Sequence, residues 1–129
     1  MKIAVLIARI LLGLIFVVFG LNGFHPFIPM KPPTGALAAQ YSGALFLSHY
    51  LVPVFLLQLI GGVLLLSGWF IPLALVLLGP VIVNILLFHS LMAPEGIGPG
   101  LLVTLLWLIV FFGVRKAFAG IFAAKVEIG

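Results

Sequence analysis

The residues able to do chemistry are few, and most of them interrupt long apolar stretches. They are Arg9, Asn22, Gln58, Asn84 and His89. A polar side chain is costly in hydrocarbon, so each is expected to face protein or water. The amides of Gln58 and Asn84 admit two interpretations, of which the first, and the favoured one, is hydrogen bonding between helices. The second is a pocket in which Gln58, Asn84 and His89 bind a ligand with carbonyl or hydroxyl groups, such as a quinone.

The three histidines, His25, His49 and His89, form a second candidate set. Imidazoles on facing helices of a bundle can ligate a haem or another pigment. Against this, His25 and His49 fall at the edge of a span or in a loop, and Glu95 is the only carboxylate nearby that could orient a ring. We therefore favour polar anchoring at the membrane interface for the histidines, and no metal site is predicted.

Several catalytic residue types are missing from the chain. It has no cysteine and only two acidic residues, Glu95 and Glu127. A thiolate nucleophile, a disulfide shuttle and an iron–sulfur site are thereby excluded, and paired-carboxylate acid–base chemistry lacks its groups. No catalytic residue is predicted, and the chain is not expected to be an enzyme by itself.

The composition places these residues in a membrane protein. Of the 129 residues, 65% are hydrophobic and only 6% are charged, whereas soluble domains average about 25% charged residues. Apolar stretches long enough to cross a bilayer predict four helices in one transmembrane domain of residues 1–129, at about residues 3–22, 51–70, 72–92 and 99–115. The predicted fold class is all-α, a polytopic membrane four-helix bundle. The first stretch is about 20 residues long and carries Arg9, which favours a retained span over a cleaved signal.

The connections and the basic residues set the expected topology. Residues 25–50 are too rich in proline and small side chains to span, so they predict an extracytoplasmic loop with a short interfacial helix and with Tyr41 and Tyr50 at headgroup level. The segment Ala93–Gly100 predicts a tight loop on the same side. Only Lys31 falls on that side, and the other side collects Lys2, Arg9, Arg115, Lys116 and Lys125. Both termini are therefore expected in the cytoplasm, and the net charge of +4 suits contact with anionic lipid and leaves no patch for nucleic acid.

Glycines recur at helical spacing on two of the spans. Arg9, Gly13 and Gly20 share one face of the first span, and Gly61 and Gly62 fall together in the second. Small residues let membrane helices approach closely, so these four glycines are predicted packing residues. Arg9 admits two interpretations. Its shallow depth favours extension to the cytoplasmic headgroups, whereas its place on the packed face favours anchoring of a helix end or a carbonyl inside the bundle.

Two long segments resemble the DoxX and DoxX-like family of small four-helix membrane proteins. The first is ARILLGLIFVVFGLNGF, from Ala8 to Phe24, and the second runs from Gln58 to Met92. The matching features are Arg-x-x-x-Gly-x-x-Phe-x-x-x-Gly from Arg9 to Gly20, Gly-Gly-x-Leu-Leu-Leu-x-Gly from Gly61 to Gly68, and the short turn that follows. The family often carries an acidic residue near the start of its second long span, where this chain has Gln58.

The resemblance implies a small helical subunit beside electron-transfer machinery. Family members include a subunit of an archaeal terminal quinol oxidase and the membrane part of a thiosulfate:quinone oxidoreductase. We favour an accessory subunit, non-catalytic by itself, that packs against a larger respiratory or other electron-transfer complex, or against further copies of itself, in a bacterial or archaeal cytoplasmic membrane. The alternatives are a quinone-interacting oxidoreductase subunit that uses Gln58, Asn84 and His89, and a lipid-binding or small-molecule transport bundle.

Overall fold

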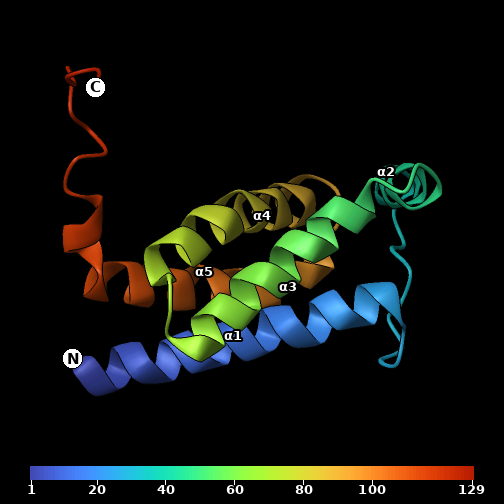
Figure 1. Ribbon diagram of the computed structural model, residues 1–129. Helices are drawn as coiled ribbons and strands as arrows, with labels where there is room; N and C mark the ends of the chain where they lie inside the picture. Colours follow the sequence, from blue (N-terminus) through green and yellow to red (C-terminus); the bar gives the residue numbers. More distant parts are fainter.

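The computed structural model describes residues 1–129 and consists of helices without strands (Figure 1). Five α-helices and two short 3-10 helices follow one another: α1 (Lys2–Phe24), α2 (Ala36–Leu47), α3 (Leu51–Ser67), α4 (Ile71–Leu91), η1 (Pro94–Gly96), α5 (Ile97–Gly113) and η2 (Arg115–Phe118). The expected all-α class is confirmed.

Three helical segments are long and apolar enough to cross a membrane, namely Lys2–Phe24, Ile71–Leu91 and Pro94–Gly113. Helix α3 has 17 residues, about 25 Å at 1.5 Å per residue, against a hydrocarbon core of about 30 Å. It counts as a fourth span only together with α2, from which it is bent by 85°. These helices, and an exterior rich in large apolar side chains, are compatible with an integral membrane protein.

Each of the four long helices packs against two others. Helix α1 contacts α3 and α5, and α4 contacts the same two helices. The chain reverses direction from each long helix to the next, so both termini lie at one end of the molecule (Figure 1). The tight turns between α3 and α4 and between α4 and α5 make these pairs antiparallel neighbours (Figure 1).

Helices α1 and α3 make the most extensive contact in the molecule, because glycines remove side chains where the two helices approach. A Cβ atom on Gly13 would lie 3.0 Å from the carbonyl oxygen of Gly62, and one on Gly62 would lie 2.9 Å from the carbonyl oxygen of Gly13. Gly20 lies against α3 in the same interface, and Gly61 lies against α4. All four glycines therefore sit at close helix contacts, where only a missing side chain leaves room for the neighbouring backbone or leucine.

Arg9 connects α1 to the end of α3. Its Nη1 atom donates a hydrogen bond to the carbonyl oxygen of Leu65 at 2.5 Å and lies 3.4 Å from that of Leu66. These oxygens are among the last four carbonyls of α3, which have no partner within the helix and carry partial negative charge. Gly68 ends the helix with a left-handed φ of 77°, and a Cβ there would lie 2.9 Å from Nη1. Of the two interpretations of Arg9, the structure shows the anchoring of a helix end.

Helix boundaries differ from the predicted spans by up to three residues, and two of these differences have a clear cause in the backbone. Helix α3 ends at Ser67 rather than at residue 70, because the left-handed Gly68 and Phe70 form the turn into α4. Helix α5 begins at Ile97, so the last four residues of the predicted loop Ala93–Gly100 are helical. Pro99 permits this because it is the third residue of the helix, where the N–H that proline lacks has no helical partner to lose.

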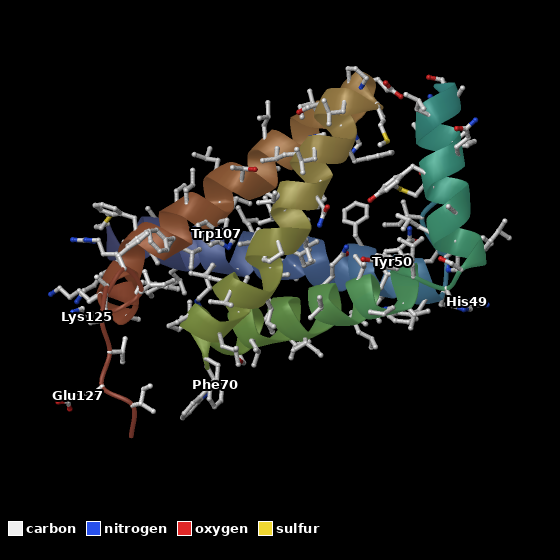
Figure 2. All side chains as sticks on the ribbon, turned by 90° about the horizontal axis from the view of Figure 1, so that it is seen from above. His49, Tyr50, Phe70, Trp107, Lys125 and Glu127 are labelled. Carbon is white, nitrogen blue, oxygen red and sulfur yellow. The ribbon has the colours of Figure 1, made fainter.

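Helices α3 and α4 diverge from their tight turn at Phe70 like the arms of a V, and α2 crosses the open end (Figure 2). Helix α2 is the short helix expected between residues 25 and 50. It is joined to α3 through Ser48–Tyr50, where His49 has a φ of 62°. The V and the crossing helix together leave a space at the end of the molecule away from the termini.

We expect Gly62→Ala to destabilise the fold. The added methyl group would lie 2.9 Å from the backbone of α1 at both the Gly13 oxygen and the Val17 nitrogen, and such overpacking typically costs about 1–3 kcal/mol. Gly43→Ala on α2 is the matched control, because no atom lies within 4 Å of a Cβ there. Thermal unfolding in mild detergent measures both variants. Equal melting temperatures for the two variants would show that the α1–α3 contact is not as close as the structure has it.

Candidate functional site

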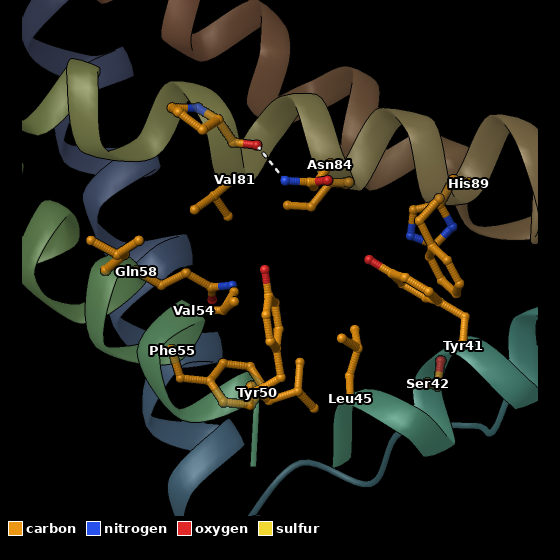
Figure 3. Close-up of a pocket in the computed structure, with 15 residues that line it drawn as sticks. Tyr41, Ser42, Leu45, Tyr50, Val54, Phe55, Gln58, Val81, Asn84 and His89 are labelled. Atoms are coloured by element: carbon orange, nitrogen blue, oxygen red, sulfur yellow. Dashed lines mark hydrogen bonds between the residues drawn. The ribbon is translucent and has the colours of Figure 1, made fainter. Parts of the chain in front are cut away.

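A cavity of about 400 Å³ occupies the opening of the V, between α2, α3 and α4 (Figure 3). Ten of its 15 lining residues are hydrophobic. The polar groups that reach it come from all three helices and the α2–α3 junction: Tyr41, Ser42, Tyr50, Gln58, Asn84 and His89. The structure therefore brings together Gln58, Asn84 and His89, the three residues that the sequence suggests as a binding set. A largely apolar wall with a few convergent polar groups is typical of small-molecule sites.

Gln58 is the most buried polar residue of this cavity, with 9% of its surface exposed. It lies on the face of α3 that carries Gly61 and Leu65. Its amide makes no hydrogen bond to the protein, and neither amide atom is sealed off from the cavity. Figure 3 shows the amide directed into the cavity, toward the Tyr50 ring. Because buried amides are nearly always hydrogen-bonded, the partner of Gln58 must come from whatever fills the cavity.

Asn84 lies on the α4 side of the cavity. Its Nδ2 atom donates to the carbonyl oxygen of Pro80 at 3.1 Å, one turn earlier in the same helix. The side chain is exposed rather than packed between helices. Neither Gln58 nor Asn84 hydrogen-bonds another helix, so the favoured interpretation of these amides as interhelical hydrogen bonds is wrong for this structure. The Gln58 amide and the Oδ1 atom of Asn84 have no hydrogen-bond partner in the protein.

His89 lies further along α4, near the turn into η1. Its Nδ1 atom is 3.0 Å from the carbonyl oxygen of Ala93. The imidazole ring fills the place where Gly96 lacks a side chain, because a Cβ on Gly96 would overlap the ring. This packing and the hydrogen bond fix the ring at the edge of the cavity, with its second nitrogen, Nε2, free of any protein partner.

Two tyrosines complete the polar lining, and the sequence did not suggest them for it. Tyr41 of α2 stacks on Phe88 at 5.4 Å between ring centroids, and Phe88 meets the His89 ring edge-on at 5.0 Å. The hydroxyl groups of Tyr41 and Tyr50 point into the cavity (Figure 3), whereas the sequence predicted both residues as anchors at headgroup level. The available signal was the spacing of Tyr41, Ser42 and Leu45, which places all three on one face of a short helix.

No lining residue of the cavity is Asp, Glu, Lys or Arg. An ionic headgroup placed there would have no counter-charge, and an unpaired charge is strongly disfavoured in a largely apolar site. The chemistry of the lining therefore suits an uncharged ligand that offers hydrogen-bonding oxygens and an apolar body.

A second hollow of about 240 Å³ adjoins the first along α4. The two share Tyr41, Asn84 and Phe88, and the second is lined otherwise by Leu87, Leu91 and Met92. Its lining is almost wholly apolar. The shared residues place the first cavity, with its few convergent polar groups, beside an almost wholly apolar hollow, an arrangement that suits an amphipathic ligand.

The other two histidines do not join this site. His25 ends α1 and His49 lies in the bend between α2 and α3, and both are exposed. No three side chains of the metal-ligating types His, Cys, Asp and Glu lie close enough together to hold a metal ion. The set His25, His49 and His89, considered for a haem or pigment, is thus not assembled in this structure.

Comparison with known proteins gives no relative for this chain. No family model, no curated protein and no solved structure matches it.

Proposed function

We propose that this chain is an integral membrane four-helix bundle whose cavity between α2, α3 and α4 binds a quinone-class ligand. The observation that carries the proposal is Gln58, a side chain nine-tenths buried whose amide faces the cavity without a protein partner. Asn84, His89 and two tyrosine hydroxyls surround the same space. A quinone head is uncharged, planar and rich in oxygen, and its isoprenoid tail suits the adjoining apolar hollow.

We further propose that the chain works as an accessory subunit of a respiratory or other electron-transfer complex. The chain has no cysteine and no cluster of metal-ligating side chains, so in this proposal the redox group that exchanges electrons with the quinone belongs to the partner. The resemblance to the DoxX family points in the same direction, since its members include quinol- and quinone-linked subunits. A large fraction of the exterior is apolar, which allows a membrane partner or a second copy to cover it in place of lipid.

The proposed orientation places both termini in the cytoplasm of a bacterium or archaeon. Five of the six basic residues lie at the end of the molecule that holds both termini, and Lys31 lies at the other end. An excess of Lys and Arg marks the cytoplasmic side of membrane proteins. The cavity, at the end away from the termini, then opens in the outer half of the membrane.

Single-cysteine labelling tests this orientation, because the chain has no cysteine of its own. We expect a membrane-impermeant maleimide to label Lys31→Cys in intact cells and to label Lys125→Cys only after permeabilisation. The cysteine-free parent chain is the control for background labelling. The reverse pattern would place the termini outside.

The ligand is tested with Gln58→Leu. In lipid nanodiscs, the unaltered protein is expected to bind tetramethylbenzoquinone or its hydroquinone saturably, as measured by calorimetric titration. Loss of one hydrogen bond to the ligand should weaken binding about tenfold. Gln40→Leu is the matched control, since Gln40 is exposed on α2 and does not line the cavity. Absence of saturable binding, or equal affinity in the two variants, would rule out this role for the cavity.

The accessory role is tested by extraction from the native membrane in a mild detergent. We expect a tagged copy of the chain to co-purify with a larger membrane protein that carries a haem, flavin or iron–sulfur group, identified by mass spectrometry and an absorption spectrum. The comparison is extraction in a harsh detergent, which should release the chain alone. A free monomer under both conditions contradicts the accessory role and leaves ligand binding unaffected.

A further inference from the structure

The two polar side chains that α4 contributes to the cavity are both tied to backbone carbonyl oxygens. Asn84 Nδ2 lies 3.1 Å from the oxygen of Pro80, and His89 Nδ1 lies 3.0 Å from the oxygen of Ala93. A carbonyl oxygen can only accept a hydrogen bond, so the nitrogen donates in both contacts. These contacts fix which way the Asn84 amide is turned, and they fix the neutral His89 ring as the tautomer with its proton on Nδ1.

The consequence is that α4 offers hydrogen-bond acceptors to the cavity. With its proton on Nδ1, the neutral His89 ring has a lone pair on Nε2. With Nδ2 turned to its own helix, Asn84 is left with Oδ1, which accepts only. Neither atom makes a hydrogen bond within the protein. The Nε2 atom of the half-buried His89 is not sealed from its surroundings, and Asn84 is an exposed residue.

The side of the cavity opposite α4 offers hydrogen-bond donors. Tyr41 and Tyr50 bring phenolic O–H groups from α2 and the α2–α3 junction, and Gln58 brings an amide that can donate or accept. Tyr41 is held in place by stacking on Phe88, and its hydroxyl makes no hydrogen bond with His89. The two acceptor atoms of α4, His89 Nε2 and Asn84 Oδ1, therefore have no hydrogen-bond donor within the protein.

We propose that the cavity selects the reduced, hydroquinone form of its ligand, with His89 Nε2 and Asn84 Oδ1 accepting hydrogen bonds from the ligand's O–H groups. This inference rests on the proposed function and adds the redox state that the site prefers. An oxidised quinone has carbonyl oxygens only. It can accept from Tyr41, Tyr50 and Gln58, but it leaves both acceptors of α4 without a partner, which is unfavourable in a largely apolar site. A hydroquinone satisfies both walls, because each of its hydroxyl groups donates and accepts.

The test compares three probes that share one ring: tetramethylhydroquinone, tetramethylbenzoquinone and the dimethyl ether of the hydroquinone. Calorimetric titration is carried out on the full chain in nanodiscs, anaerobically for the hydroquinone. We expect the hydroquinone to bind about a hundredfold more tightly than the quinone, since it adds two hydrogen bonds that each contribute about tenfold. The ether has no O–H group and is expected to bind most weakly. Binding of the quinone as tight as that of the hydroquinone overturns the inference.

Two variants test whether the side chains of α4 cause the preference for hydroquinone over quinone. His89→Phe keeps a ring of similar size and removes the Nε2 acceptor, and it should lower hydroquinone affinity about tenfold with quinone affinity unchanged. His25→Phe is the matched control, because His25 is exposed and does not line the cavity. Asn84→Leu removes the second acceptor, and because Asn84 bonds only its own helix, this variant should fold even where His89→Phe does not. An equal loss of affinity for both redox forms in these variants overturns the inference.

A neutral lipid with a hydroxyl group could offer the same donor, so dioleoylglycerol is a fourth probe. We expect it to bind more weakly than the hydroquinone, because it has no ring to lie against the aromatic side chains of Tyr41 and Phe88. Tighter binding of dioleoylglycerol overturns the assignment to a hydroquinone. Failure of the two proposals is distinguishable: no binding of any ring probe removes the proposed function, whereas Gln58-dependent binding without a preference for the hydroquinone removes only this inference.

Discussion

The hydrogen bonds from Arg9 to the last carbonyls of α3 are the contact on which the arrangement of helices depends. The last four carbonyl oxygens of a helix have no partner within the helix, and in apolar surroundings they need partners from elsewhere in the protein. The guanidinium supplies donors to Leu65 and Leu66, while Leu64 accepts from the Gly68 amide and from the Ser67 hydroxyl. With its C-terminus capped in this way, α3 can stop after 17 residues and turn at once into α4. The short α3 and the tight turn fix the apex of the V, and the cavity is the space between its arms.

Most of the remaining buried polar side chains also have hydrogen-bond partners within the protein, and the exception lies at the cavity. Asn22 is buried, and its Oδ1 atom accepts hydrogen bonds from the backbone amides of Phe27 and Ile28. These bonds hold the segment that follows α1 against the end of that helix. Trp107 of α5 donates to a carbonyl oxygen of α4, and Thr104 donates to a carbonyl in its own helix. Each of these groups is satisfied by nearby backbone, as hydrocarbon surroundings demand. The amide of Gln58 has no such partner although it is nearly as buried as Asn22. Asn84 and His89 also contact backbone carbonyl oxygens through one nitrogen each, so Gln58 is the buried polar side chain of the cavity that has no hydrogen-bond partner in the protein.

The sequence predicts which segments are helical better than it predicts how the helices are oriented relative to one another. Long apolar runs and the helical spacing of small residues are local signals, and they suffice for the helices and for the four glycines as packing residues. They do not predict that Gly13 lies against Gly62. The partner of Arg9 could not be predicted, because it depends on the axial position of α1 relative to α3, which a sequence pattern within one helix does not contain. The tyrosines of the cavity were missed for a similar reason. Their direction depends on the 85° bend between α2 and α3, which passes through His49 at a φ of 62°. Glycine would have signalled such a conformation, whereas a histidine does not.

The two ends of the molecule differ in chemistry because they meet different physical demands. The end with the termini carries most of the charge, and there Arg9 and the tight turn hold three helices together through backbone oxygens. The other end has a short crossing helix and a cavity lining without Asp, Glu, Lys or Arg, and backbone contacts hold the Asn84 amide and the His89 ring in fixed orientations there. Neutral dipoles in a low-dielectric site discriminate between ligands by the direction of each hydrogen bond rather than by charge. Under the proposed function, the two redox forms of the ligand differ only in whether their oxygens carry hydrogen, so the orientation of Asn84 and the tautomer of His89 would decide between them, whereas the volume of the cavity would not.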